Sequence, residues 1–290
     1  MKMQSIESAE SAKQSALVDQ AAHAAELIDQ ADAIVVAAGA GMGVDSGLPD
    51  FRGTQGFWQA YPALAQARLD FPSVASPRTF ERDPRVAWGF YGHRLALYRR
   101  TIPHEGFRIL LELGARTAQG LGVFTSNVDG QFQRAGFDPA RVHECHGSIH
   151  HLQCTRRCCE AIWSADLFEP EVDESACTLR GDPPLCPHCG ALARPNLLMF
   201  GDWDWIATRS EGQERALRAW LARCDRPVVI EVGAGTAIPS VRHFAHRVVV
   251  DGGGRLVRIN PTDCAVPSRL DVGMPVGAAQ ALRAIRDALA

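Results

Sequence analysis

Short apolar runs rich in β-branched residues recur along the chain, and segments of helical periodicity separate several of them. The apolar runs are Ala33–Ala38, Gly122–Thr125, Val228–Val232, Arg247–Val250 and Leu256–Ile259. Unbroken runs of this kind are typical of strands buried on both faces of a parallel sheet. Helical spacing of apolar residues predicts helices over Ala16–Ala31, Val86–Arg100, Gly106–Leu113, Glu211–Arg223 and Ala278–Leu289. Strands that alternate with helices predict an α/β fold with a doubly wound parallel sheet.

The cysteines add a metal site to this picture. The chain has nine cysteines, an odd number, and most of them lie between residues 154 and 189. Such clustering is typical of metal binding in a reducing compartment rather than of a disulfide framework. Cys186 and Cys189 have the C-x-x-C spacing of a zinc knuckle. We expect a closed structural zinc site with the ligands Cys154, Cys158, Cys186 and Cys189. Cys159 is the alternative to Cys158, and His188 is a weaker substitute.

Two stretches interrupt the alternation of strands and helices. Residues 54–115 contain helices without apolar strands, and residues 151–200 contain the cysteine cluster. We therefore expect a Rossmann-like domain into which a helical module and a zinc-binding module are inserted. The expected boundaries are 1–15 for a flexible N-terminal tail, 16–53, 116–150 and 224–290 for the Rossmann-like domain, 54–115 for the helical module and 151–200 for the zinc-binding module.

Composition and charge narrow the classes of partner. The 290 residues are 46% hydrophobic and 22% charged, and they contain no apolar run of about eighteen residues that would span a bilayer. The N-terminal segment MKMQSIESAE lacks the apolar stretch of a secretory signal. A net charge of −3 argues against direct nucleic-acid binding, which usually needs a basic surface. We expect a cytoplasmic protein with no membrane or nucleic-acid partner, and the oligomeric state stays open.

A glycine-rich loop follows the first predicted strand. Gly39-Ala40-Gly41-Met42-Gly43 allows a tight turn that brings backbone N–H groups against a pyrophosphate. An ordinary tight turn explains a short glycine motif as well. A dehydrogenase fold would continue directly into a long helix, whereas this chain continues with Gly47 and Pro49.

Residues 39–53 resemble the first signature of the sirtuin family, Gly-Ala-Gly-x-Ser-x-x-Ser-Gly-Ile-Pro-Asp-Phe-Arg. Gly43 stands where that family usually has serine, and Leu48 replaces its isoleucine. The resemblance implies an NAD site in which the backbone of the first loop faces the phosphates and a second segment closes over the nicotinamide ribose. The residues implied are Gly39, Ala40 and Gly41 for the phosphates, and Asp50, Phe51 and Arg52 for the closing segment.

Ser126-Asn127-Val128-Asp129 follows the second predicted strand. Polar residues at the carboxyl end of a parallel strand point into the crevice where such sheets bind ligands, although a helix-capping turn explains Asn127 and Asp129 equally well. The family pattern here is Thr-Gln-Asn-Ile-Asp. The resemblance implies a catalytic and cofactor-binding Asn127 near the reactive ribose and Asp129 on the nicotinamide carboxamide. Ser126, in place of glutamine, changes the contacts with the cofactor.

His146-Gly147 lies where the sirtuin family carries its catalytic histidine, just before the zinc module. Cleavage of the nicotinamide–ribose bond leaves cationic character on the sugar carbon, which the carbonyl oxygen of an acyl-lysine captures. A neutral imidazole then deprotonates a ribose hydroxyl near physiological pH. His143, His150 and His151 are rival candidates by proximity.

A second glycine loop follows the strand Val228–Val232. Gly235-Thr236-Ala237 stands where the family has Gly-Thr-Ser, and Asn260 matches its residue at the adenosine ribose. Phe200-Gly201-Asp202 resembles the family's Phe-Gly-Glu, which with the second loop binds the substrate peptide as an added strand. Trp203 and Trp205 depart from the family pattern and reshape that cleft.

Tyr91 and Arg94 lie at i and i+3 on the helix Val86–Arg100, and hence on one face. Some sirtuins that remove succinyl or malonyl groups carry Tyr-x-x-Arg at a comparable place, where the arginine pairs with the acyl carboxylate. The alternative is that Tyr91 packs inside the helical module while Arg94 is solvated.

The resemblance covers roughly residues 30–290 and implies an NAD-dependent protein lysine deacylase that contains zinc. Its expected partner is an acylated lysine in a protein or peptide, and its expected products are nicotinamide and O-acyl-ADP-ribose. One alternative is an ADP-ribosyltransferase or NAD glycohydrolase, and another is an NAD-sensing module without turnover. The departures at Gly43, Ser126 and Ala237 keep both alternatives open.

Overall fold

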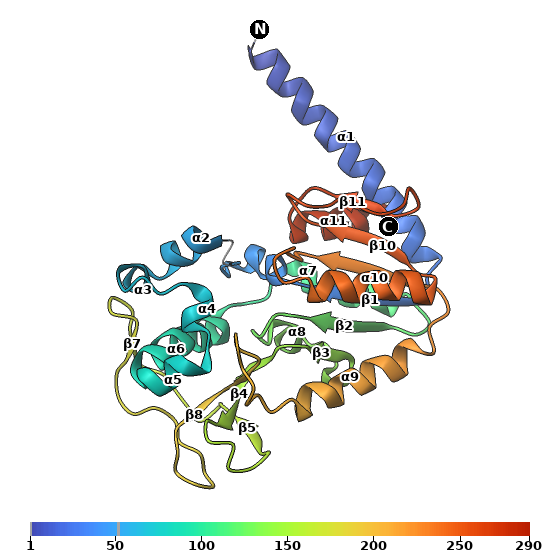
Figure 1. The fold of residues 1–290 in the computed structure, drawn as a ribbon. Coiled ribbons are helices and arrows are strands. Elements are labelled where there is room, and N and C mark those ends of the chain that lie inside the picture. Colours follow the sequence, from blue (N-terminus) through green and yellow to red (C-terminus); the bar gives the residue numbers. More distant parts are fainter. Residues whose placement is uncertain (1, 51–52) are drawn as a thin grey trace.

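A six-stranded parallel sheet forms the centre of this computed structural model, which describes the backbone of residues 2–50 and 53–290 (Figure 1). The sheet order is β11-β10-β9-β1-β2-β3, and each neighbouring pair is parallel. The strands are β1 (Ala33–Ala38), β2 (Leu121–Thr125), β3 (Val142–Glu144), β9 (Pro227–Val232), β10 (Arg255–Ile259) and β11 (Val272–Met274). The predicted Rossmann-like doubly wound sheet is therefore confirmed.

The order of the strands creates a switch point between β1 and β9. From β1 the chain moves outward to β2 and β3, then returns to the opposite side of β1 at β9 and continues to β10 and β11. The loops that follow β1 and β9 therefore leave the sheet in opposite directions. In sheets of this topology, the carboxyl ends of the two strands open a crevice where ligands bind.

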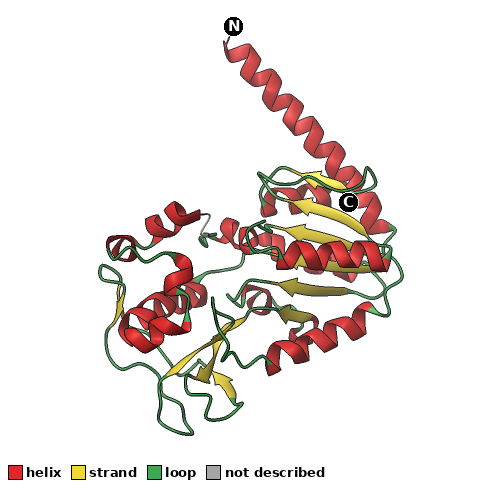
Figure 2. Ribbon diagram, viewed as in Figure 1, coloured by secondary structure: helices red, strands yellow, loops and turns green. Residues whose placement is uncertain are grey.

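Helices cover both faces of the sheet (Figure 2). Ile34 and Val36 of β1 point to one face, where they pack with α1 (Lys2–Asp29), α7 (Glu105–Ala115) and α11 (Ala278–Ala288). Val35 and Ala37 point to the other face, where they pack with α9 (Thr208–Leu221) and α10 (Ser240–Gly252). Because every residue of β1 is buried, the strand has an unbroken apolar sequence rather than an alternating one.

The two inserted modules share a single hydrophobic core beside the sheet. The Trp88 indole of the helical module donates a hydrogen bond of 3.0 Å to the Ala193 carbonyl of the cysteine-containing module. Ile149, Leu152 and Leu197 of the latter pack among the aromatic residues of the former. The helices are α2 (Gly53–Ala60), α3 (Pro62–Gln66), α4 (Phe71–Val74), α5 (Pro77–Arg82) and α6 (Pro84–Arg100). The strands are β4 (Gly147–Cys154), β5 (Ile162–Ser164), β6 (Val172–Asp173), β7 (Thr178–Leu179) and β8 (Ala193–Leu197).

Shorter helical elements complete the chain. They are the 3-10 helices η1 (Ala40–Ser46) and η2 (Pro139–Arg141) and the helix α8 (Gln131–Arg134). Although the expected helical module included α7, this helix packs through Phe107, Leu110 and Leu113 into the core of the sheet.

The N-terminal helix is longer than its apolar pattern indicates. Leu17, Ala21, Ala24 and Ile28 pack into the core of the sheet, which accounts for the predicted helix over Ala16–Ala31. The structure continues α1 to Lys2, so helix replaces the flexible tail expected over 1–15, and it projects from the body of the molecule (Figure 1). No helix within the described residues is both long and apolar enough to cross a membrane.

One predicted strand is wrong. Arg247–Val250 lies within helix α10, because the apolar residues from Val241 onward follow helical spacing, with Phe244 and Ala245 buried on the same face. Three consecutive valines imitate a strand locally, but Val250 is on the exposed side of the helix. The short strands β3 and β11 were not predicted, because runs of three residues give too little periodicity.

Candidate active site and metal centre

The loops after β1 and β9 are in direct backbone contact at the switch point. The Gly41 N–H donates a hydrogen bond of 3.0 Å to the Gly233 carbonyl. A Cβ atom on Gly39 would lie 2.7 Å from the Gly233 oxygen, and one on Gly41 would lie 2.6 Å from the Gly233 Cα. Glycine is therefore required on both sides of the contact. The crevice at the strand ends is lined by backbone, which suits the close approach of a pyrophosphate.

The segment after β2 is tied to the first glycine loop. The Asn127 side-chain amide donates a hydrogen bond of 3.0 Å to the Gly39 carbonyl, and its backbone N–H donates one of 3.0 Å to the Thr125 hydroxyl. Thr125 in turn donates to the Ala38 carbonyl. These contacts place Ser126 and Asn127 at the crevice, beside the end of β1.

Asp129 is a buried carboxyl group close to these residues. Its Oδ1 accepts a hydrogen bond of 2.9 Å from the Gln131 backbone N–H at the start of α8, whose N-cap residue is Gly130. Burial raises the pKa of Asp129 to about 6, while the Gln131 hydrogen bond opposes this shift. Asp129 thus bonds the first backbone N–H of α8 without being the N-cap residue, and its pKa is perturbed as at many functional sites.

The second glycine loop and the end of β10 form the other side of the crevice. Gly235 and Thr236 are exposed in the loop between β9 and α10. The buried Asn260 follows β10, where its amide donates a hydrogen bond of 3.0 Å to the Ala234 carbonyl and its oxygen accepts from the Thr262 backbone. The Asn260 side chain thus holds this loop in position.

The segment expected to close over the nicotinamide ribose is only partly described. Asp50 is half-buried after η1. Phe51 and Arg52 lie outside the described residues.

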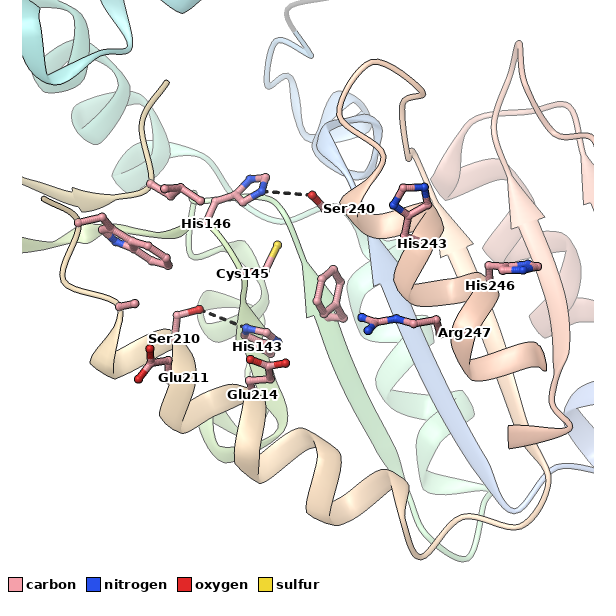
Figure 3. Close-up of a pocket in the computed structure, with 14 residues that line it drawn as sticks. His143, Cys145, His146, Ser210, Glu211, Glu214, Ser240, His243, His246 and Arg247 are labelled. Carbon is pink, nitrogen blue, oxygen red and sulfur yellow. Dashed lines mark hydrogen bonds between the residues drawn. The ribbon is translucent and has the colours of Figure 1, made fainter. Parts of the chain in front are cut away.

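His146 lies between β3 and β4, at the edge of a cleft beside the crevice (Figure 3). Its Nε2 is 3.5 Å from the Ser240 hydroxyl oxygen of α10. Burial lowers the pKa of His146, and an interaction with the Ser126 backbone partly opposes that shift. The imidazole is therefore neutral at neutral pH, which is the form that can accept a proton.

Burial lowers the pKa of each of the three rival histidines, so all three are neutral at neutral pH. The Nε2 of His143 lies 3.2 Å from the Ser210 hydroxyl oxygen, and burial lowers its pKa to about 4. The Nε2 of His150 lies 2.9 Å from the Asp129 carbonyl oxygen. Burial also lowers the pKa of His151 to about 4.

Four cysteine thiols converge at one end of a second, three-stranded sheet of order β5-β4-β8. The Sγ atoms of Cys154, Cys158, Cys186 and Cys189 all lie within 4.8 Å of one another. Two of the separations, Cys154 to Cys189 and Cys158 to Cys186, are 3.6 Å. A tetrahedral zinc with Zn–S bonds of about 2.3 Å spaces its sulfurs about 3.8 Å apart, so these thiols fit zinc.

The backbone of the first cysteine turn favours metal binding. Burial opposes ionisation of the Cys154 thiol, but hydrogen bonds from the Cys158 and Arg156 backbone and from the Cys189 and Cys158 thiols together lower its pKa to about 7. Cys159, the alternative ligand, lies beside this group with its Sγ 3.7 Å from that of Cys158.

A buried ion pair fixes the segment after β8. Both Arg194 Nη atoms donate to Asp202, at 2.6 and 2.9 Å, and the two side chains are 2% and 0% exposed. Asp202 also accepts from the Met199 backbone. Because a bidentate pair of this kind has one geometry, it holds Phe200 and Gly201 at the edge of the site.

The two indoles in this segment differ in environment. Trp203 is 92% exposed. Trp205 is half-buried and lines the cleft beside His146.

Tyr91 and Arg94 are both buried, so the expectation of a solvated Arg94 is wrong. The Tyr91 ring stacks on Phe80 with centroids 5.7 Å apart. The Arg94 side chain donates from Nε and Nη2 to the Tyr98 hydroxyl, at 2.9 and 2.6 Å, and its guanidinium lies 5.2 Å from the Phe90 centroid. Aromatic rings thus replace water around this cation.

The cleft beside His146 was not predicted from the sequence. It has a volume of about 770 Å³ and lies between α9 and α10. Its walls carry Glu211, Glu214, His243 and Arg247 (Figure 3). Only the helical spacing of apolar residues in α10 could have indicated this wall of the cleft. The three consecutive valines in α10 resemble a strand and obscure that spacing.

The sheet, its glycine crevice and the four-thiol module define a class of protein: a dinucleotide-binding α/β fold with an inserted metal module. The model of the Sir2 family matches residues 39–233. The chain belongs to the Sir2 family, which confirms the resemblance to sirtuins.

Several relatives are similar to this chain over most of its length. NAD-dependent protein deacylase 2 of Pyrobaculum aerophilum is 32% identical over 253 residues, covering 86% of this chain and 87% of the relative. NAD-dependent protein deacylase 1 of Pseudomonas aeruginosa is 32% identical, with 81% and 86% covered. Among solved structures, a Sir2 homologue in complex with NAD is similar with a TM-score of 0.65 and 25% identity, covering 92% and 94%.

The first prediction separates the two adjacent cysteines. Cys158→Ser should lose most of its bound zinc and lower the melting temperature by more than about 5 °C, because the metal closes the module. The matched change Cys159→Ser should leave the zinc content unchanged. Elemental analysis and thermal unfolding of the purified variants provide the measurement. Zinc loss in Cys159→Ser alone would reverse the assignment.

The second prediction concerns the buried carboxyl of Asp129. Since the folded state keeps this proton up to about pH 6, against 3.8 for the ordinary carboxyl, the free energy of unfolding should fall as pH rises through this interval. This decrease in the free energy of unfolding is on the order of 3 kcal/mol, and Asp129→Asn should abolish it. Urea unfolding across the interval measures it, with exposed Asp251→Asn as the control. Identical pH dependence in the wild type and Asp129→Asn would contradict the burial effect.

Proposed function

We propose that this chain is an NAD-dependent protein lysine deacylase that transfers the acyl group to ADP-ribose. The observation that carries the proposal is a neutral, half-buried His146 at the point where the glycine crevice meets an open cleft. The relatives named NAD-dependent protein deacylase, similar over more than four-fifths of the chain, support the same activity. The products are nicotinamide, the free lysine and O-acyl-ADP-ribose.

The NAD site is assigned to the carboxyl ends of β1, β2, β9 and β10. These ends are adjacent in the sheet, so residues distant in sequence surround one crevice. NAD supplies a cleavable bond between nicotinamide and ribose, and the protein supplies the surface that orients it. The residues are Gly39, Ala40, Gly41, Asp50, Phe51, Arg52, Ser126, Asn127, Asp129, Gly235, Thr236 and Asn260.

His146 acts as the general base. Its low proton affinity, caused by burial, keeps the imidazole free to take a proton from a ribose hydroxyl at neutral pH. Asn127 is a catalytic positioning group, since its amide is oriented by the Gly39 carbonyl. The Ser240 hydroxyl, 3.5 Å from the His146 Nε2, orients the ring.

Zinc has a structural role. Four thiolates complete its coordination and leave no position for substrate. The ligands Cys154, Cys158, Cys186 and Cys189 join the start of β8 to the end of β4, and they thereby support the Phe200–Gly201 edge of the substrate site.

The acylated lysine belongs to a protein or peptide that lies between Phe200–Gly201 and the loop after β9. None of the nine cysteines, all of which lie in the part of the chain that the structure describes, forms a disulfide, which suits a reducing compartment such as the cytoplasm.

The third prediction tests the activity itself. With NAD and an acetyl-lysine peptide, mass spectrometry should find nicotinamide, the deacetylated peptide and O-acetyl-ADP-ribose. His146→Ala should lower turnover at least about 100-fold, as loss of a general base does, and change NAD affinity little. His151→Gln is the matched control and should keep its activity.

The other outcomes of this experiment identify the alternatives. Nicotinamide released without deacylation would indicate ADP-ribosyl transfer or NAD hydrolysis. NAD that binds and remains intact would indicate a sensing module. Unchanged turnover in His146→Ala would remove His146 from its role.

The acyl range is proposed to include groups that end in a carboxylate, such as succinyl and malonyl. Arg94 is a buried guanidinium, 8% exposed, and close enough to Asp129 to lower the pKa of that carboxyl. Tyr91 lies one helical turn before it on the same face of α6. A buried cation near the nicotinamide side of the crevice attracts an acidic acyl group.

The fourth prediction compares acyl groups in one protein. Arg94→Ala should lower kcat/KM for a succinyl-lysine peptide at least about 10-fold relative to an acetyl-lysine peptide, because a charge-assisted hydrogen bond is lost. Arg94→Lys keeps the charge but loses the bidentate geometry. Its kcat/KM for the succinyl-lysine peptide should therefore lie between those of the wild type and Arg94→Ala. Equal succinyl activity in all three folded proteins would contradict the acidic acyl pocket.

A further inference from the structure

A groove runs between α9 and α10 on the face of the sheet beside His146. The cleft of about 770 Å³ next to His146 adjoins a second hollow of about 360 Å³. Both are lined by Phe124, His143, Glu214 and Arg247, so they form one continuous α9–α10 groove. One end of the groove lies at His146, Leu198 and Trp205, and the other lies near the carboxyl ends of the two helices.

At the His146 end of the α9–α10 groove, the carboxylates lie on one wall and Arg247 lies on the other, whereas the far end also carries Arg218 on α9 and Asp251 on α10. Glu211 and Glu214 lie on the α9 wall, and His243 and Arg247 lie on the α10 wall (Figure 3). The Arg247 side chain extends into the space between the helices in this view. Glu214 pairs with Arg218 at 2.6 Å along its own helix. Within the described part of the chain, neither Glu211 nor Arg247 has an ion-pair partner within 4.0 Å.

The floor of the groove suits binding rather than chemistry. The Phe124 and Phe244 rings stack with centroids 4.1 Å apart and close the bottom. Burial raises the pKa of the Cys145 thiol to about 12, so this thiol stays protonated and is a poor nucleophile. His146 is the one catalytic group proposed for this region, and it stands at the entrance.

We infer that the α9–α10 groove binds the part of the acylated substrate chain that lies next to the lysine and selects it by charge. This inference rests on the proposed deacylase function. The occupant carries an acidic side chain that pairs with Arg247 and a basic one that pairs with Glu211. An extended chain directs successive side chains to opposite sides. Two facing walls of opposite charge can therefore contact the side chains at neighbouring positions of one extended segment.

The groove also adjoins the reaction centre, which supports this occupant over an unrelated ligand. A chain that lies between Phe200–Gly201 and the loop after β9 is next to Leu198 and Ser240, the sequence neighbours of those two segments, and both residues line this cleft. The wall charges are exposed or half-buried rather than enclosed. Each contact is therefore expected to change specificity by a few-fold rather than to decide binding alone.

The experiment uses full-length protein, NAD and a panel of acetyl-lysine peptides. Each peptide has Asp, Ala or Lys at one position on either side of the acetyl-lysine. In the wild type, the best-placed Asp should raise kcat/KM about two- to fivefold over Ala at low salt, and high salt should remove the gain. Arg247→Glu should reverse this preference, and Glu211→Lys should strengthen it while weakening a preference for Lys at the neighbouring position.

The matched control is Arg215→Glu, the same charge change on an α9 residue that does not line the groove. This variant should keep the wild-type ratio of kcat/KM for the Asp peptide to kcat/KM for the Ala peptide. The affinity for NAD should be equal in all variants. If Arg247→Glu and Arg215→Glu change the ratio equally, or if the wild type deacetylates every peptide alike, the groove assignment is overturned. Failure of the proposed function has a different signature, because no peptide would then be deacetylated by the wild type.

Discussion

The contact between two glycine loops is the constraint on which the rest of the structure depends. Gly39 and Gly41 follow β1, Gly233 follows β9, and the two strands pair in register up to Ala38 and Val232. Because the chain leaves these strands in opposite directions, a crevice opens at their ends. Its walls are backbone, since any Cβ in the contact would overlap the opposite loop. The contact therefore consists of backbone atoms, held by the hydrogen bond from the Gly41 N–H to the Gly233 carbonyl, rather than of packed side chains.

The other parts of the site are arranged around this contact by short polar links. Asn127 reaches the Gly39 carbonyl from the end of β2, and Asn260 reaches the Ala234 carbonyl from the end of β10. His146 stands beside this assembly, with its basicity lowered by burial. The inserted modules share one aromatic core and carry the Arg194–Asp202 pair, which fixes the substrate edge. In the proposed function, the crevice binds the cofactor and the insertions shape access for the acyl group.

The sequence predicts those features that are encoded locally. The run Ala33–Ala38 identifies a buried strand, the glycines after it identify the crevice, and the paired cysteines identify the metal module. Features that depend on distant residues are not predictable in this way. Nothing near Asp202 in the sequence distinguishes a buried partner of Arg194 from a surface carboxylate, and the facing of Glu211 and Arg247 exists only after α9 and α10 pack. At Val248–Val250 the local sequence is misleading, because a β-branched run that is typical of a strand lies in a helix. The periodicity of that helix is set by residues upstream of the run.

The most direct test of this account is a comparison of two glycines that share one backbone conformation. Gly233 has φ of 62° and contacts Gly41, whereas Gly253 has φ of 64° and no neighbour that a Cβ would meet. Gly253→Ala should lower the free energy of unfolding by about 1–2 kcal/mol, the cost of the left-handed conformation alone. Gly233→Ala should cost at least about 2 kcal/mol more and weaken NAD binding, because the loops must separate. Equal losses of stability, with NAD affinity unchanged in both variants, would contradict the central role of the loop contact.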